Sequence, residues 1–425
     1  MKLLRTLRSP VILFMAAFAL RIALASNYVG LANRAGAPYL HSEPAHIAAH
    51  LAKGEGFSSP YDGVPLAPTA QQPPLYPLFL AVIFRLFGVY SLRAFWVMTV
   101  MNALVGAGVS SLLCAVGRKY ISSTAGVIAA WIWALSPATI TADLFGSIYP
   151  FSALVVLLWL LILPGMLESA KGWMVLGVVL GLATLLNPML LILLPASAGW
   201  LLHKRRQTVA IVVVSMAIVV PWIVRNYFAL GHLYPVRDNF GLELYLGNHA
   251  GMRRHFARNC AWNLCDGTDD YGTAEFPDHS QLFVRAGEGA FMEAKRQEAV
   301  AYIRAEPGAF LVRSAKRAAS FWLLPSPWFY LPMFGLMLAG IMQVSGATRM
   351  FFLLLLVLYP ISFYVTHVAW VTSYRHPIEP LMLLAAGLAL DRWGKLLVAR
   401  LIPGNPHSPI TLTITRLSRC PSNSA

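Results

Sequence analysis

The sequence predicts an all-α membrane protein that crosses the bilayer several times. Hydrophobic residues make up 57% of the chain and charged residues only 12%, with a mean hydropathy of +0.61. Ordinary soluble domains carry about twice that share of charge. Several apolar segments approach the roughly 20 residues that a helix needs to cross a hydrocarbon core about 30 Å thick. Strand-length alternation is not evident, so helices are the expected spanning element.

About ten segments are expected to cross the membrane. Under a cytoplasmic N-terminus, every short loop on the inside carries Lys or Arg, whereas the outer loop SPATITADLFGS carries neither. This alternation predicts that both termini are cytoplasmic. The expected spans are residues 10–26, 93–116, 124–138, 148–166, 172–186, 188–202, 208–224, 328–343, 349–367 and 377–391.

The N-terminal stretch MKLLRTLRSPVILFMAAFALRIALAS has two interpretations. Its basic flank and apolar run are typical of a signal peptide, with ALAS as a cleavage site. An uncleaved first span is favoured because Arg21 lies late in the run, where its side chain could snorkel to the far interface.

Two long segments, residues 27–92 and 225–327, fall on the outer side, and function is expected there. The first contains two expected interfacial helices. One is capped by Glu43, has Pro44 at its first position and ends at Gly54, and the other is LYPLFLAVIFRLFG. The expected divisions are a membrane module with the first outer loop (1–224), a periplasmic segment with amphipathic helices (225–327), the last spans (328–391) and a cytoplasmic tail (392–425).

The net charge of +15 would indicate a nucleic-acid partner in a soluble protein. Here most basic residues lie in inside loops or along the second outer segment, so membrane topology and anionic headgroups explain them, and no nucleic-acid partner is expected. After Pro307, residues Arg313, Lys316 and Arg317 predict a basic amphipathic helix lying on the headgroups.

Four cysteines are too few for a disulfide framework. Cys114 lies in a predicted span and is expected to pack there. Cys260 and Cys265 would face an oxidising exterior, where a local disulfide and two free thiols both remain open. Their spacing, without a second matching pair, argues against a zinc site.

Three patterns carry a resemblance to a known family. They are E..HIA..LA.G.GFSSPY....PTA..PPLYP in the first outer loop, PW.VRNY...G...PVR.NFG.ELYLGN at the start of the second, and the late YRHPIEPLMLLAA. Together they resemble bacterial members of the GT-C superfamily, polytopic glycosyltransferases similar to the protein O-mannosyltransferases and the lipid A aminoarabinose transferase. The resemblance implies a GT-C-like fold, a polyprenyl-phosphate sugar donor, and an active site on the periplasmic face of the bacterial inner membrane.

The resemblance also implies an acidic residue just after the first span. Many members have Asp there, often as Asp-Glu, whereas this chain has Ser42-Glu43, so Glu43 takes the role if Glu can replace Asp. A carboxylate within reach of an acceptor hydroxyl is a suitable base, and burial at an interface would raise its pKa toward the working range. The alternative is that Glu43 only caps its helix.

Departure of a phosphate requires cations. Arg225 ends a span at the outer surface, and Arg375 with His376 begins the last one, so Arg225 and Arg375 are predicted to bind the donor phosphate, with interfacial anchoring as the alternative. His376 is predicted to bind substrate beside Arg375. Asp62 is predicted to bind substrate, and it and Glu288 are candidates for a second carboxylate.

No cofactor is required by this reaction, and a divalent metal stays an open alternative. His46 and His50 are four residues apart on one helix, close to Glu43 and His41. Pro44 swings Glu43 off that helical register, and the family pattern does not supply the two histidines, so no metal ligand is assigned.

The alternative function is a transporter or flippase of lipid-linked saccharides. Against it, no pair of Gly- or Pro-broken spans recurs, and few ionisable residues lie at predicted span centres. Neither the sugar nor the acceptor is indicated by the sequence.

Overall fold

The chain is helical in the computed structural model, which describes residues 7–34, 42–61, 65–144, 147–249, 287–366 and 371–401. Within these ranges, strand-like pairing is limited to one antiparallel bridge between Ser58 and Pro68. In chain order the helices are α2 (Pro10–Arg34), α3 (Glu43–Lys53), α4 (Leu75–Phe87), α5 (Leu92–Tyr120), α6 (Ser123–Leu135), α7 (Pro137–Leu144), α8 (Tyr149–Met166), α9 (Ala170–Leu186), the 3-10 helix η2 (Pro188–Ile192), α10 (Leu193–Ala196), α11 (Ala198–Leu201), α12 (Arg205–Leu230), α13 (Phe240–Gly247), α15 (Glu288–Ala305), α16 (Pro307–Leu323), α17 (Pro327–Ile341), α18 (Gly346–Leu358), α19 (Ile361–Val365), α20 (Val371–Arg375) and α21 (Glu379–Leu401).

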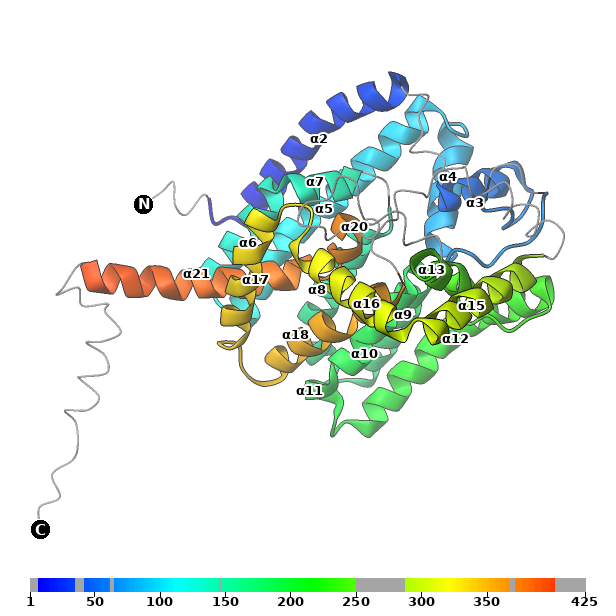
Figure 1. Cartoon of the computed structure of the whole chain (residues 1–425). Coiled ribbons are helices and arrows are strands. Elements are labelled where there is room, and N and C mark those ends of the chain that lie inside the picture. Colours follow the sequence, from blue (N-terminus) through cyan, green and yellow to red (C-terminus); the bar gives the residue numbers. More distant parts are fainter. Residues whose placement is uncertain are drawn as a thin grey trace, which may run out of the picture.

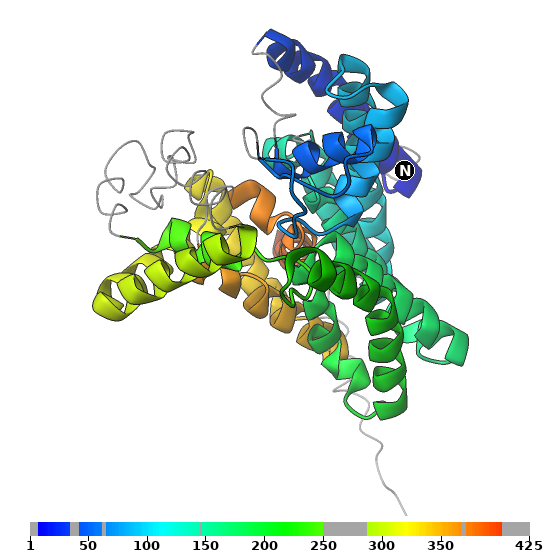
Figure 2. The same ribbon diagram turned by 90° about the vertical axis from the view of Figure 1, so that its right-hand side faces the viewer.

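The helices pack around one large apolar core. Trp133, Trp159, Phe351 and Tyr359 are almost fully buried in it and come from α6, α8, α18 and the residue after α18. Figure 1 shows α21 running into this bundle, with its far end projecting on the left, while α3, α4, α13 and α15 gather at the opposite end of the molecule. In the turned view of Figure 2, α15 extends away from the bundle on the left.

The count of ten spans is not confirmed. Among the described residues, four helical stretches are long and apolar enough to cross a membrane: α5, α8, α12 and Gly346–Val365, which joins α18 and α19. Two bent pairs raise the number to six, with bends of 62° between α6 and α7 and 89° between α16 and α17. The class itself, an all-α protein with several membrane spans, is confirmed.

Two predicted elements were wrong. Residues 188–202 do not form one span, because the Asn187 side chain accepts a bond from the Met189 amide and starts a 3-10 turn at Pro188, which breaks into α10 and α11. The predicted outer loop SPATITADLFGS instead contains α7, whose axis bends by 62° from that of α6. At the other end of the chain, α21 continues to Leu401, past the expected end at 391.

The expected helices of the first outer loop are present. Ser42 rather than Glu43 occupies the cap position of α3, and Glu43 and Pro44 form its first turn. Gly54 ends the helix in the left-handed region, with φ of 82°, and its amide bonds back to the carbonyls of His50 and Leu51. Helix α4 matches the second expected helix.

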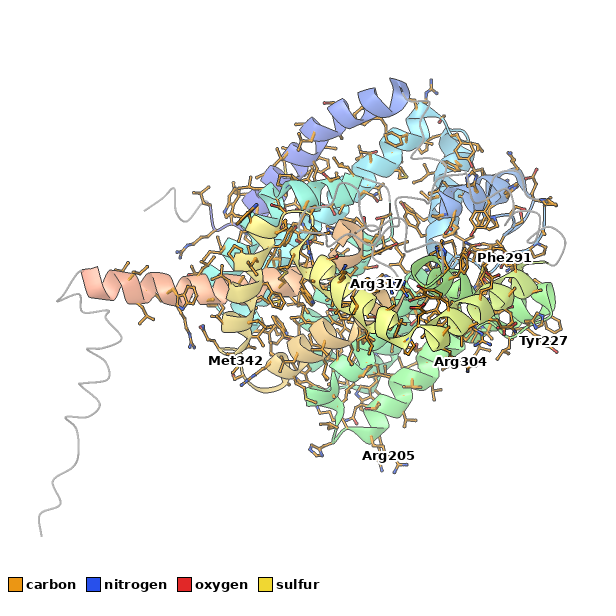
Figure 3. All side chains as sticks on the ribbon, viewed as in Figure 1. Arg205, Tyr227, Phe291, Arg304, Arg317 and Met342 are labelled. Atoms are coloured by element: carbon orange, nitrogen blue, oxygen red, sulfur yellow. The ribbon has the colours of Figure 1, made fainter. Side chains whose placement is uncertain are left out.

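Helix α16 differs from the predicted headgroup helix. Its cations Arg313 and Arg317 are 4% and 0% exposed, whereas Leu311 and Val312 are 66% and 57% exposed. Figure 3 shows Arg317 among the helices, where its guanidinium donates to the carbonyls at the end of α13 and of α19. The apolar face of α16 therefore points outward, while Arg317 binds backbone carbonyls inside and Arg313 donates to the Tyr302 hydroxyl over 2.7 Å.

Helices α9 and α12 approach each other closely through two glycines. A Cβ added at Gly177 would lie 2.6 Å from Val214 Cβ, and one at Gly181 would lie 2.7 Å from Ile218 Cβ. The spacing of these glycines is that of small residues at membrane helix contacts. This contact fixes the line of α12 and so positions Arg225, near its far end, against the first outer loop.

A cluster of ionisable side chains is buried inside the bundle. Arg21 Nε lies 2.6 Å from Asp143 Oδ2, and His376 Nε2 lies 2.8 Å from Asp143 Oδ1. All three residues are 0% exposed. The expectation that Arg21 snorkels was wrong, because Asp143 on α7 offers a closer partner. Gly106 on α5 leaves the space, since a Cβ there would meet the Asp143 carboxylate at 2.1 Å.

Candidate functional site

The Glu43 carboxylate is half-buried at the start of α3, and both of its oxygens are bound by side-chain amides. Gln71 Nε2 donates to Glu43 Oε1 over 3.0 Å, and Gln72 Nε2 donates to Glu43 Oε2. The Tyr61 hydroxyl bonds to both Gln71 and Glu43. These bonds go to other residues of the first outer loop and not to the amides of α3, so the side chain of Glu43 is not acting as a helix cap.

Two charged residues from the second outer segment lie near this carboxylate. Arg237 and Glu243 form an ion pair with 3.6 Å between Nη2 and Oε1, and each side chain is 28% exposed. Burial raises the pKa of Glu43 to about 6, with Arg237 acting to lower it and Glu243 to raise it. A carboxyl group with this pKa is ionised at neutral pH but still basic enough to accept a proton.

We call this set the Glu43 cluster: Glu43, Tyr61, Gln71, Gln72, Arg237 and Glu243. Tyr149, at the start of α8, lies within electrostatic reach of its three charged members. The Tyr149 ring contacts the Tyr374 ring, with 5.9 Å between centroids. The cluster is therefore assembled by α3, the loop before α4, and α13 with the segment that leads into it, with α8 alongside.

Arg225 holds the first outer loop in place. Its Nη1 donates to the Thr69 carbonyl over 2.6 Å and its Nη2 to the Phe57 carbonyl over 2.8 Å. The guanidinium also lies over the rings of Phe57 and Trp222, at 5.3 and 4.9 Å from their centroids. These contacts use the donors that phosphate binding would need, so that role stays a prediction and would require Arg225 to release the loop.

Arg375 and His376 are both fully buried in the bundle. Arg375 Nη1 donates to the Phe321 carbonyl over 2.6 Å, and its guanidinium lies 3.7 Å from the centroid of the Tyr330 ring. His376 belongs to the cluster with Asp143. Both residues thus make these contacts in the interior rather than at Glu43. The fourth predicted substrate ligand, Asp62, lies outside the described residues.

Glu288 binds the same loop as Arg225. Its Oε2 accepts from the Thr69 hydroxyl over 2.5 Å, and its Oε1 accepts from the Ala70 amide over 2.6 Å. Asp238 lies beside it, and each of the two acids is 6% exposed. Burial raises the pKa of both carboxyl groups. The predicted second carboxylate therefore holds the loop that carries Gln71 and Gln72, rather than forming part of the Glu43 cluster.

The histidines considered as metal ligands have other partners. His46 Nδ1 lies 3.1 Å from the Tyr90 hydroxyl, and His50 Nδ1 lies 2.5 Å from Glu55 Oε2. No group of three His, Cys, Asp or Glu side chains suited to a metal occurs within the described ranges. His41, Cys260 and Cys265 lie outside them.

The sequence alone indicated no role for the two amide residues that donate to Glu43 or for the two charged residues that lie near it. Gln71 and Gln72 stand in PTAQQPPLYP, and Arg237 and Glu243 stand in PVRDNFGLELYLGN. Both stretches belong to the patterns that carry the resemblance. Polar residues inside a family pattern were the available signal, but pairing two stretches so far apart in the chain required the structure.

Comparison with known proteins gives one sequence family and several similar structures. Residues 71–225 match the family described as dolichyl-phosphate-mannose-protein mannosyltransferase. No curated protein matches the chain. The matched region includes Gln71, Gln72 and Arg225, whereas Glu43 and Arg237 lie outside it.

Two solved structures are similar to the chain over most of its length. The archaeal oligosaccharyltransferase AglB from Archaeoglobus fulgidus, in complex with an inhibitory peptide and a dolichol-phosphate, is 15% identical, with a TM-score of 0.47 over 88% of this chain and 49% of that chain. ArnT from Cupriavidus metallidurans bound to undecaprenyl phosphate is 16% identical, with a TM-score of 0.34 over 92% of this chain and 81% of that chain. The chain spans about half the length of the AglB structure.

The match to the mannosyltransferase family indicates which family the chain resembles. The matched family consists of membrane glycosyltransferases of the kind that the three sequence patterns indicated. The matched region, residues 71–225, overlaps the first two of those patterns. It thereby confirms the resemblance to the GT-C superfamily: the chain is an all-α, multi-pass membrane protein similar to the protein O-mannosyltransferases.

Proposed function

We propose that the chain is a membrane glycosyltransferase that moves a sugar from a polyprenyl-phosphate donor to an acceptor on the periplasmic face. The observation that carries the proposal is the Glu43 carboxylate, half-buried, with a pKa raised to about 6 and held by two amides beside the cation Arg237. Strongly perturbed acids next to a specific charge partner are typical of functional sites.

In this proposal Glu43 acts on the acceptor. Its carboxylate accepts the proton of an acceptor hydroxyl as the oxygen attacks the anomeric carbon. The bond between that carbon and the donor phosphate oxygen breaks, and polyprenyl phosphate leaves with the electron pair. Gln71 and Gln72 keep the carboxylate in one orientation, which preserves the alignment that such a step needs.

Arg237 is the proposed phosphate ligand. Its side chain is 28% exposed, and it contacts Glu243 over 3.6 Å, a weak pairing that leaves donors for a ligand. Arg can grip a phosphate through two donors at once. Arg375 would be a second ligand only if the groups that cover it moved. Arg225 supports the reaction by holding the loop.

The donor and the sidedness rest on the family and on charge. The matched family is named for dolichyl-phosphate mannose, a sugar on a polyprenyl phosphate. The alternation of Lys and Arg among the short loops supports the proposal that the Glu43 cluster faces the outer, periplasmic side of a bacterial inner membrane. We propose no metal ion for the step.

One observation favours the transporter alternative. Arg21, Asp143 and His376 are ionisable residues buried inside the bundle, which removes the argument that such residues are few. However, they are paired with one another and 0% exposed, whereas the Glu43 cluster contains the exposed charges that a reaction needs.

The direct test is release of the lipid carrier. Purified protein in nanodiscs is incubated with radiolabelled polyprenyl-phosphate sugars, and free polyprenyl phosphate is measured. At least one donor is expected to release it faster than empty nanodiscs do. Movement of labelled lipid between leaflets without any new glycosidic bond would instead establish the transporter alternative.

Replacing Arg237 with Gln is expected to raise the KM for the lipid donor roughly ten- to hundredfold, the cost of losing a charge-assisted bond to phosphate. Steady-state kinetics at varied donor concentration measure this change. The matched control is Arg296→Gln, which removes an exposed cation paired with Glu293 over 2.6 Å and should leave KM unchanged. An equal effect in both variants would show that Arg237 has no specific contact with the donor.

A further inference from the structure

In the first outer loop, the carbonyl of each of residues 69–71 accepts a hydrogen bond from a group in the second half of the chain. Arg225 donates to the Thr69 carbonyl over 2.6 Å. The Asp238 amide donates to the Ala70 carbonyl over 3.1 Å, and Arg237 Nε donates to the Gln71 carbonyl over 3.2 Å. Glu288 accepts from the Thr69 hydroxyl and from the Ala70 amide. This short stretch is therefore held by three separate parts of the fold.

Two buried acids take part in holding this stretch. Each of Asp238 and Glu288 is 6% exposed, and both bond to Ala70: the Asp238 amide donates to its carbonyl, and Glu288 Oε1 accepts from its amide. The charge of Glu288 acts to raise the pKa of Asp238. Both oxygens of Glu288 accept bonds from the loop, whereas neither oxygen of Asp238 receives a donor within the described residues. Two adjacent buried carboxyl groups cannot both be charged, so one proton between them satisfies Asp238 as well.

We infer that Asp238 and Glu288 share a proton and form a latch that positions residues 69–72, and through them the Glu43 carboxylate. The inference deepens the proposed function and rests on it for its catalytic meaning. Asp238 and Glu288 are positioning residues, because they act through the loop and have no contact with Glu43 in the structure.

Residues 69–72 connect the Asp238–Glu288 latch to the Glu43 carboxylate. Gln71 follows Ala70 in the chain, and its side-chain amide donates to Glu43 over 3.0 Å. Gln72 donates to the other carboxylate oxygen. A shift of Ala70 away from Glu288 would thus pull both amides from Glu43, and a misplaced base loses much of its rate advantage.

Other charged groups face the pair from each neighbouring element. Arg225 on α12 favours the ionised form of Glu288, and Arg237 favours the ionised form of Asp238. Tyr234 lies near both acids and near Glu293 on α15. Burial outweighs these effects and raises the pKa of both acids. The latch is therefore closed while one proton remains and opens as pH rises through the raised pKa of Asp238.

The variants Asp238→Asn and Asp238→Ala distinguish the effect of the titrating proton from the effect of the side-chain shape. Asn keeps an N–H donor for Glu288 but does not titrate, whereas Ala leaves no donor. Hydrogen exchange of the peptide that contains residues 69–72 is followed by mass spectrometry between about pH 6 and 9, with rates divided by the intrinsic rate at each pH. Wild type should lose protection about tenfold or more at high pH, Asn should stay protected throughout, and Ala should be unprotected throughout.

Two outcomes would overturn the inference. One is an identical pH profile in wild type and Asp238→Asn, and the other is loss of protection on adding EDTA, which would mean that the acids hold a divalent cation instead. Exchange does not depend on transferase activity, so a latch that behaves as expected in an inactive protein would refute only the proposed function. In an active enzyme, Asp238→Asn should extend activity to higher pH and leave the acid side unchanged.

Discussion

Replacing Glu43 with Gln is expected to lower the rate of sugar transfer about 10²- to 10⁴-fold, the usual contribution of a positioned general base. Gln has nearly the same shape but cannot accept a proton from the acceptor hydroxyl. It also offers only one carbonyl oxygen to the two amides of Gln71 and Gln72, so part of the loss comes from orientation. Initial rates at saturating donor measure the change.

The Glu43 carboxyl group also determines how the rate of sugar transfer should depend on pH. Because burial raises the pKa of Glu43 to about 6, the fraction of the basic form falls as pH drops below that value. The transfer rate should therefore decrease on the acid side with a midpoint near this pKa, and this limb should be absent from any residual activity of Glu43→Gln. Acidification does not weaken the fold through Glu43, because a raised pKa means that the folded state favours the protonated form.

Glu55→Gln is the control on the same loop. Glu55 is 38% exposed and pairs with His50 over 2.5 Å, so its loss should leave both the rate and the acid limb near their wild-type values. Activity of Glu43→Gln within a few-fold of wild type would exclude Glu43 as the base. The acid would then be sought at Glu243, the other carboxylate of the cluster, whose side chain is 28% exposed.

Replacing Asp143 with Asn is expected to destabilise the protein by about 3–5 kcal/mol, the usual result of removing one partner from a buried ion pair. Arg21 would then be left as an unpaired charge, and His376 would lose its acceptor. Because these residues join α2, α7 and the turn before α21, the loss should lower the midpoint of thermal unfolding in detergent and the yield of folded protein.

Two further variants make this result interpretable. Glu168→Gln breaks an exposed pair with Lys204, whose atoms lie 3.6 Å apart, and should change stability little. The double variant Arg21→Met with Asp143→Leu removes both charges and should recover much of the lost stability. A single Asp143→Asn variant as stable as wild type would show that the buried cluster does not tie the helices together.

Local features of the sequence were sufficient for the class and for the helices of the first outer loop. Helix α3 begins beside Pro44 and ends at Gly54 as its cap signals indicated, because these signals act within one or two turns. The amphipathic stretch after Gly287 likewise forms α15. Hydropathy alone, however, predicted one unbroken span over residues 188–202, since it does not register where Asn187 and Pro188 stop a helix.

The side-chain roles were less accessible from the sequence. Arg21 was expected at an interface because its partner, Asp143, is 122 residues away and stood in a segment interpreted as a loop. Arg225 was chosen for a phosphate because it ends a span, but its donors bind carbonyls of a distant loop. The interpretation of each cation depended on which acceptor lies nearest, and that acceptor is seldom close in the chain.

By itself, the sequence determined that this is a helical membrane protein with a GT-C resemblance and that an acidic residue begins a short helix after the first span. The class follows from composition and hydropathy, the resemblance is carried by three sequence patterns, and the short helix follows from signals that act over a few residues. Only the tertiary structure decided that Arg237 and Glu243 accompany Glu43, and that Asp238 and Glu288 hold the loop beside it. The physical reason is that burial and charge at a site depend on contacts between distant segments, whereas the onset of a helix depends on its neighbours.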